Sequence, residues 1–282
     1  AAAERAGLRL YLGSYPITPA TDVLHELSKH KSLGVVTVQC EDEIAGCASP
    51  LGASFAGALA VTSTSGPGMC LKSEAMNLAV IMELPLVVLD VQRGGPGLGG
   101  IQPSQADYFQ ATKGGGHGDY HMIVLAPASV QEMADLTVKA FTLADQYRMT
   151  AMILADGTMG QMMEPVSLDL EIPPVPEKPW ATTGTQCKRK HNIINSLSLV
   201  PEELEQLNRA RYAKYAEIER NEVMVEEYMM DDAEYCIVAF GIAARVSKNA
   251  IAEARKAGIK VGLIRPITLW PFPTEAIARA AD

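Results

Sequence analysis

The stretch that decides the fold is ALAVTSTSGPGMCLKSEAMNLAVIMELPLVVLDV, at residues 58–91. An apolar run leads into a glycine-rich loop, a segment of helical length and a second apolar run. The spacing predicts strands over 58–62 and 85–91 and a helix over 69–82. Both runs are almost continuously apolar, which is typical of parallel strands buried on both faces. The stretch therefore predicts a strand–helix–strand unit of an α/β protein.

The same alternation extends in both directions. Four further strands are predicted, over 8–13, 35–40, 122–125 and 150–155. Four further helices are predicted, over 19–30, 42–56, 103–110 and 129–147. We therefore expect residues 1–165 to form an α/β domain with a parallel sheet covered by helices. Such sheets bind ligands at the carboxyl ends of their strands.

The character of the chain changes after this domain. Five prolines between residues 164 and 190 predict an extended linker, and the charged segment 201–230 predicts one long helix. Residues 166–231 are therefore interpreted as a linker and a charged helix. A strand at 235–239, a helix at 243–257 and a strand at 260–264 then begin a second, smaller α/β domain over 232–282. The helix-like ends AAAERAG and TEAIARAAD suggest a chain cut from a longer protein.

Composition excludes several classes of function. The 282 residues are 48% hydrophobic and 20% charged, which is typical of a globular protein. The net charge of −9 argues against binding of nucleic acid, because it leaves no excess of basic residues to contact phosphates. Five cysteines without a C-x-x-C pair predict a reduced, cytoplasmic location and no zinc or iron–sulfur site in this chain. Residues 44–71 carry no charge, but their prolines and glycines argue against a membrane span.

Polar residues gather directly after predicted strands. In EDE, at 41–43, Glu43 precedes the uncharged run, so water-poor surroundings would suit it to proton exchange. The alternative is that these acids only favour a helix start. In TSTSGPGM, at 62–69, free backbone amides face whatever binds at the helix start, although a plain turn is the alternative. In SYPITPATD, at 14–22, two prolines hold Thr18 in a rigid loop that could recognise a carboxylate or simply turn the chain.

The sequence contains two more glycine-rich loops, RGGPGLGG at 93–100 and KGGGHGD at 113–119, which is more glycine than turns alone require. Their conformational cost is justified where backbone must approach a ligand or a partner chain closely. His117 stands out within the second loop, whereas the other histidines lack metal-ligand spacing. GxSxG and HExxH are both absent, which leaves a serine hydrolase or a zincin without support.

Together these segments resemble the α subunit of the 2-oxoacid:ferredoxin oxidoreductases. The resemblance rests on YPITP at 15–19, EDEIAG at 41–46, TSTSGPG at 62–68 and QRGGPGLGGIQPSQADYFQATKGGGHGDY at 92–120. It continues through LAPASVQEM at 125–133, ILADGTMGQMMEPV at 153–166 and IRPITLWPFP at 264–273. The first seventy residues are similar to the 2-oxoglutarate enzymes, and the later segments to the branched-chain enzymes that act on 2-oxoisovalerate.

The resemblance implies an enzyme that uses thiamine diphosphate to decarboxylate a 2-oxoacid oxidatively, forms an acyl-coenzyme A and reduces ferredoxin. It favours 2-oxoisovalerate as substrate, with 2-oxoglutarate, giving succinyl-CoA, as the alternative. This chain would supply the pyrimidine-type domain and a second domain of the transketolase C-terminal type. A β subunit would hold the diphosphate and Mg²⁺, and γ and ferredoxin-like δ subunits would complete the assembly, with the [4Fe–4S] clusters in partner chains.

This sequence lacks a clear match to the family's motif for binding the diphosphate of the cofactor. The nearest match to the family's Gly-Asp-Gly motif is ADG at 155–157, and no asparagine follows between residues 158 and 191. We therefore expect ADG to be a turn at a strand end, and the diphosphate site to lie in another chain.

The resemblance also assigns roles residue by residue. Glu43 matches the glutamate that bonds N1′ of the cofactor's pyrimidine and so promotes removal of the C2 proton, with Glu41 as the competing candidate. Ser65 and Gly66 would line the cofactor through backbone contacts. Thr18 would approach the substrate's carboxylate or carbonyl.

Arg93 matches an arginine that pairs with the substrate carboxylate, for which a planar fork of donors is suited. His117 and Asp119 are possible residues of the active-site border, and no metal ligand is assigned to this chain. Pro50 departs from the family pattern, and a proline there is expected to kink the helix. Two other readings stay open, namely a different split thiamine enzyme and a non-catalytic α/β scaffold.

Overall fold

The main body of the protein is a seven-stranded sheet. The computed structural model describes residues 3, 7–169, 174 and 176–281. The strands are β1 (Leu10–Ser14), β2 (Val36–Gln39), β3 (Leu59–Thr64), β4 (Leu86–Gln92), β5 (Ile123–Leu125), β6 (Thr150–Asp156) and β10 (Thr268–Trp270). Their order is β10-β5-β6-β4-β3-β1-β2, and only β10 runs antiparallel to its neighbour among these strands. The predicted parallel α/β sheet is confirmed.

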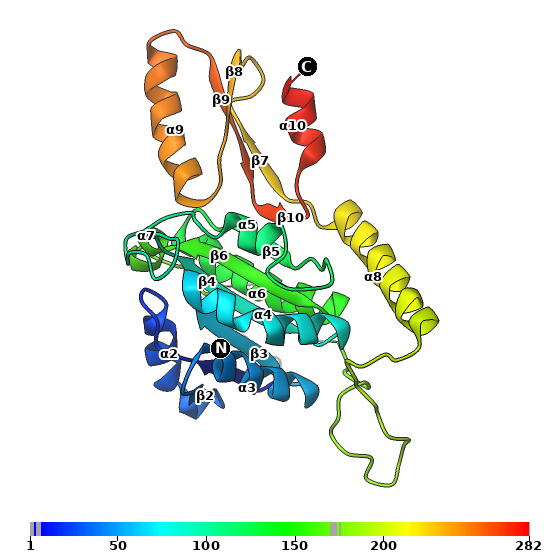
Figure 1. The fold of residues 1–282 in the computed structure, drawn as a ribbon. Coiled ribbons are helices and arrows are strands. Elements are labelled where there is room, and N and C mark those ends of the chain that lie inside the picture. The colour runs from blue at the N-terminus through cyan, green and yellow to red at the C-terminus, as the bar shows by residue number, and fades with distance from the viewer. Residues whose placement is uncertain (1–2, 4–6, 170–173, 175, 282) are drawn as a thin grey trace.

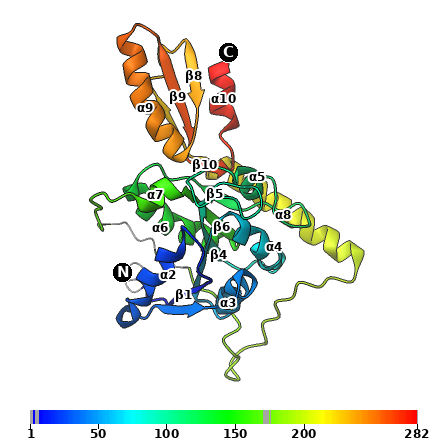
Figure 2. The same cartoon turned by 60° about the vertical axis from the view of Figure 1, so that its left-hand side comes forward.

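Helices cover both faces of this sheet. Helices α2 (Thr21–Ser28) and α6 (Val130–Tyr147) lie on one side, and α3 (Glu43–Phe55) and α4 (Gly66–Ile81) on the other (Figure 2). Shorter pieces are η1 (Lys31–Leu33), α5 (Tyr108–Thr112) and α7 (Gly157–Gln161). Ser129 caps α6 by accepting a hydrogen bond from the Glu132 amide, as is typical of a serine that stands three residues before a glutamate at a helix start. The predicted N-terminal helix end falls largely outside the described residues.

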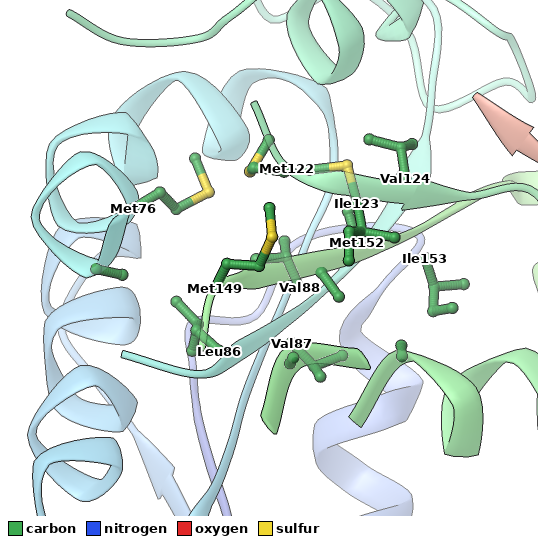
Figure 3. Close-up of a cluster of buried hydrophobic side chains, with 14 of the residues drawn as sticks. Met76, Leu86, Val87, Val88, Met122, Ile123, Val124, Met149, Met152 and Ile153 are labelled. Carbon is green, nitrogen blue, oxygen red and sulfur yellow. The ribbon is translucent and has the colours of Figure 1, made fainter. Parts of the chain in front are cut away.

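The core lies where the central strands meet both helical layers. Leu86, Val87 and Val88 of β4 are completely buried and stand among the side chains of β5 and β6 (Figure 3). Methionines, among them Met76 and Met152, fill the space toward α4 (Figure 3). Burial on both faces explains why these strands are largely apolar.

The uncharged run at 44–71 is divided among three elements of this core. It supplies α3, β3 and the first turn of α4. Helix α3 continues through Pro50, and the proline ring lies directly against Gly13 of β1, where a Cβ atom would collide with it. Within the described parts of the chain, no helix combines the length and the apolar character that crossing a membrane requires.

A second, smaller unit stands at one end of the main sheet (Figure 1). Its sheet has the order β7-β9-β8, formed by β7 (Val225–Tyr228), β9 (Val261–Pro266) and β8 (Tyr235–Val238). Helix α9 (Gly241–Lys256) packs against it, and α8 (Pro201–Asn221) and α10 (Thr274–Ala281) flank the connection to the main body. Buried Arg265 ties the two units together by donating hydrogen bonds to both carboxylate oxygens of Glu132 on α6, at 2.8 and 2.9 Å.

Two predicted helices need correction, and a strand was missed. The helix predicted over 201–230 ends at Asn221, because the chain then pairs with β9 as strand β7. The Met224 carbonyl accepts hydrogen bonds from the Ile267 and Thr268 amides, and this tertiary pairing overrides helical propensity. The helix predicted over 103–110 is instead α5, because Pro103 is held in an antiparallel bridge to Arg93. The antiparallel strand β10 was not predicted at all.

Candidate active site

The predicted site residues follow four neighbouring strands at one edge of the main sheet. Thr18 follows β1, Glu43 follows β2, Ser65 and Gly66 follow β3, and Arg93 follows β4. These four strands are adjacent and parallel, so their carboxyl ends lie at the same edge. The fold therefore gathers residues that are up to 75 positions apart in the chain.

Glu43 is the first residue of α3. The preceding Asp42 caps the helix, and its Oδ1 accepts a hydrogen bond from the Ala45 amide at 2.8 Å. This cap fixes the direction in which Glu43 leaves the backbone. The Glu43 side chain is half-buried, whereas Glu41 is exposed. Of the two glutamates that the sequence leaves in competition, Glu43 is the one that turns toward the α4 loop.

Gly68 shows how closely Glu43 approaches that loop. A Cβ atom at residue 68 would lie 2.5 Å from Thr64 Oγ1, 2.9 Å from Glu43 Cγ and 3.0 Å from Ile17 Cδ1. Any side chain there would displace the glutamate, so glycine is required by the close packing of α3, α4 and the β1 loop. TSTSGPG is thus more than a plain turn, since its second glycine makes room for Glu43.

Two hydroxyl groups at the junction of β3 and α4 lack partners among the described residues. Thr64 Oγ1 and Ser65 Oγ are buried and meet no hydrogen-bonding atom among the described residues. Buried polar groups without partners are rare and call for an explanation, and a bound ligand is one such explanation. These hydroxyls and the Glu43 carboxylate together offer polar partners for the edge of a planar, nitrogen-containing ring such as the pyrimidine of thiamine diphosphate.

Arg93 and Thr18 are brought into direct contact. Arg93 Nη1 donates to the Thr18 carbonyl oxygen at 2.9 Å, and Nη2 donates to the Leu98 carbonyl oxygen at 3.1 Å. Arg93 Nε is buried and has no partner among the described residues. A guanidinium has five N–H donors, so Arg93 retains donors for a carboxylate.

The glycine-rich loop after Arg93 closes on itself. The Gly100 amide donates to the Gly94 carbonyl oxygen at 2.9 Å, and Gly99, at φ 56°, lies so close to Gly94 that a Cβ atom would clash with its backbone. This closure places the Leu98 carbonyl under the guanidinium of Arg93. The loop therefore orients Arg93 through its backbone.

A pair of buried carboxyl groups beneath the site was not predicted. Asp90, within β4, is 1% exposed and faces Asp107, which is 7% exposed. Burial, reinforced by the neighbouring Asp107 carboxylate, raises the pKa of Asp90 well above its usual range. Burial also raises the pKa of Asp107, although the Gly66 amide and the Arg93 guanidinium oppose that shift. The signal in the sequence is an aspartate inside the apolar run LVVLDV.

We expect Asp90→Asn to stabilise the protein at alkaline pH. Because the pKa of Asp90 is raised by folding, the folded protein keeps a proton that the unfolded chain releases, so stability falls as pH rises above the ordinary carboxyl range. Asparagine carries a permanent donor of similar size. The free energy of unfolding of the variant should therefore exceed that of the wild type by about 1 kcal/mol at pH 8, and this difference should shrink toward pH 5.

Thermal unfolding between pH 5 and 8 measures this difference. Asp231→Asn, at an exposed position, serves as the control. It should change the stability of the folded protein by the same amount at pH 5 and at pH 8. A wild type that loses no more stability than Asp90→Asn on going from pH 5 to 8 would contradict a protonated Asp90.

His117 and Asp119 are not gathered with the other site residues. Both are exposed, and the His117 carbonyl accepts a hydrogen bond from Asn77, in the last third of α4 and far along the helix from Gly66. His117 lines a separate cavity of about 310 Å³ with Arg211 of α8. The Asp119 carbonyl oxygen accepts a hydrogen bond from the Tyr212 hydroxyl at 3.2 Å. Their role at the border of the site stays a prediction.

The ADG segment is a strand end, as predicted. Asp156 is the last residue of β6, and its Oδ1 accepts hydrogen bonds from the Thr158 and Met159 amides at 2.9 and 3.0 Å. It therefore caps α7. Within the described ranges, no three His, Cys, Asp or Glu side chains gather as a metal site would require.

Two family models match the chain. Residues 1–229 match the thiamine-diphosphate-binding domain of pyruvate flavodoxin/ferredoxin oxidoreductase. Residues 233–282 match core domain II of pyruvate:ferredoxin oxidoreductase. A ketoisovalerate oxidoreductase subunit, VorB, of Methanothermobacter marburgensis is 51% identical over 98% of this chain and 79% of its own length.

Solved structures agree with the fold. The 2-oxoglutarate:ferredoxin oxidoreductase from Magnetococcus marinus, with 2-oxoglutarate, coenzyme A and succinyl-CoA bound, has a TM-score of 0.86 and 32% identity. The match covers 99% of this chain and 54% of that one, so this chain spans about half of its length. A split-gene transketolase, 12% identical over 99% of this chain and 75% of its own, has a TM-score of 0.56 and supports the α/β fold class alone.

Proposed function

The chain belongs to the 2-oxoacid:ferredoxin oxidoreductases as a thiamine-diphosphate-binding subunit, and from this premise we propose that it serves the oxidative decarboxylation of a branched-chain 2-oxoacid. The observation that carries the proposal is the convergence of Glu43, Thr18 and Arg93 around the α4 loop at one sheet edge. Resemblance favours 2-oxoisovalerate, because identity is 51% to a ketoisovalerate enzyme subunit and 32% to a 2-oxoglutarate enzyme.

We assign proton handling to Glu43. Thiamine diphosphate, when bound, supplies a nucleophilic carbon and an electron sink for decarboxylation. Glu43 would hydrogen-bond N1′ of its pyrimidine and share a proton there, while Ser65 and Gly66 line the ring. The close packing over Gly68 supports this assignment, since it limits the positions that the Glu43 side chain can take. The unpartnered hydroxyls of Thr64 and Ser65 offer further polar contacts.

We assign recognition of the substrate to Arg93 and Thr18. Arg93 would bind the 1-carboxylate with the donors that its bonds to Thr18 and Leu98 leave free. Ile17, whose Cδ1 lies near Glu43 Cγ over Gly68, is apolar and suits a branched aliphatic side chain better than a second carboxylate.

We further propose that the active enzyme is a hetero-oligomer in the cytoplasm. A β subunit would hold the diphosphate and Mg²⁺, and γ and δ subunits with [4Fe–4S] clusters would carry electrons to ferredoxin, with coenzyme A as co-substrate. The use of Asp156 as a helix cap supports placing the diphosphate in another chain. The five free cysteines are compatible with a reducing compartment.

The assembled complex tests this proposal through reduction of ferredoxin or a viologen with coenzyme A and a panel of 2-oxoacids. We expect kcat/KM for 2-oxoisovalerate to exceed that for 2-oxoglutarate by at least about a hundredfold, because the second carboxylate would be desolvated against apolar side chains. A preference for 2-oxoglutarate would overturn the substrate. Decarboxylation without acceptor reduction would favour another kind of thiamine enzyme.

A further inference from the structure

Lys72 is a fully buried cation directly behind the α3 start. It lies on α4, one turn after Gly68, and is 0% exposed. Its Nζ donates to Thr62 Oγ1 at 2.9 Å and to the Glu43 carbonyl oxygen at 3.2 Å. No carboxylate lies within ion-pair distance of it among the described residues. Burying an ammonium without such a partner is unfavourable, so its position calls for a reason.

The hydrogen bonds of Lys72 converge on the first turn of α3. Besides the direct bond to the Glu43 carbonyl, the Thr62 hydroxyl relays a second one, donating to the Gly46 carbonyl oxygen at 3.1 Å. Gly46 leaves room for the ammonium, because a Cβ atom there would lie 3.3 Å from Lys72 Nζ. Two carbonyl groups of the turn that carries Glu43 are thus held from inside the protein.

Lys72 also interacts electrostatically with groups near this turn. Burial lowers the pKa of Lys72, and the neighbouring Cys47 and Glu43, followed by Cys40 and Asp42, oppose that shift. The two carboxylates among these groups, Glu43 and Asp42, both lie at the start of α3. Glu43 is the one among them that turns toward the α4 loop.

We propose that Lys72 is a positioning residue for Glu43, holding the first turn of α3 by hydrogen bonds and placing a positive charge behind the carboxylate. The inference rests on the proposed function, because it concerns the same proton-handling glutamate. A lysine that only filled space could be replaced by methionine, which has similar length and no charge, with no effect specific to Glu43.

A double-mutant cycle on the assembled complex tests this role. The measured quantity is the dissociation constant of thiamine diphosphate, determined by calorimetry, for wild type, Lys72→Met, Glu43→Gln and the double variant. We expect Lys72→Met to weaken binding about tenfold in the wild type and less than about twofold in Glu43→Gln. Equal effects in both backgrounds would overturn the proposal. Met76→Ala, one turn further along α4 and also fully buried, is the packing control and should act equally in both.

A second pair of variants decides the matter if Lys72→Met fails to assemble. Thr62→Val removes the hydroxyl that accepts from Lys72 and donates to Gly46, whereas Thr62→Ser keeps it. Weaker cofactor binding in Thr62→Val alone, again absent in the Glu43→Gln background, supports the proposal. Identical behaviour of Val and Ser overturns it. If Glu43→Gln itself leaves hydrogen exchange at C2 of the cofactor unchanged, the proposed function fails before Lys72 is at issue.

Discussion

Replacing Glu43 with glutamine should slow hydrogen–deuterium exchange at C2 of bound thiamine diphosphate by about 10²- to 10⁴-fold, the usual contribution of a positioned acid or base. Glutamine keeps the size of the side chain and an oxygen acceptor, but it cannot share a proton with N1′. Gly68 itself offers no side chain between α3 and α4 that could take over this role. Exchange is measured by acid quench and proton NMR on the assembled complex.

Glu41→Gln is the matched control for this experiment. Glu41 is exposed and lies two residues before Glu43, so its variant should exchange at the wild-type rate. Size-exclusion chromatography should show the same assembly for both variants, since Asp42 rather than Glu43 caps α3. A wild-type exchange rate in Glu43→Gln, or a loss confined to Glu41→Gln, would assign the proton to another group.

The positions of the site residues could be predicted because they depend on local order. Ser65 and Arg93 follow largely apolar strands, Glu43 follows the β-branched strand VTVQ, and parallel strands end at a common edge. The contact between Arg93 and the Thr18 carbonyl could not be predicted. It depends on how the glycine loop after Arg93 closes, which Gly94 and Gly99 determine through space.

Lys72 and Asp90 were missed for a related reason. Asp90 interrupts an apolar run and Lys72 precedes the polar residues Ser73 and Glu74, but the sequence does not reveal which of these side chains the fold buries. Lys72 is buried because Gly46, on a different helix, leaves space for it. Similarly, β7 and β10 form because residues more than 30 positions apart pair with each other, and their own propensities do not require strands.

Replacing Arg93 with alanine should raise KM for the 2-oxoacid by about 10- to 100-fold, because hydrogen bonds to a charged group contribute about 1.5–3 kcal/mol. KM for coenzyme A should change less than about twofold. Arg93 donates to the backbone carbonyls of Thr18 and Leu98, so its removal also loosens the β1 loop and the glycine loop that the guanidinium joins. Steady-state kinetics with each substrate varied in turn measures both constants.

Arg93→Lys separates charge from geometry in the same experiment. Lysine keeps the positive charge but cannot donate to two carbonyl groups and a carboxylate as a planar fork does, so its KM should fall between those of wild type and alanine. The half-buried Arg93 also lies near Asp107, whose raised pKa it opposes, so assembly must be verified by size-exclusion chromatography before kinetics are interpreted. An intact Arg93→Ala complex with an unchanged KM for the oxoacid would show that the carboxylate is bound elsewhere. An assembly defect shared by both variants would instead place Arg93 at the interface with a partner subunit.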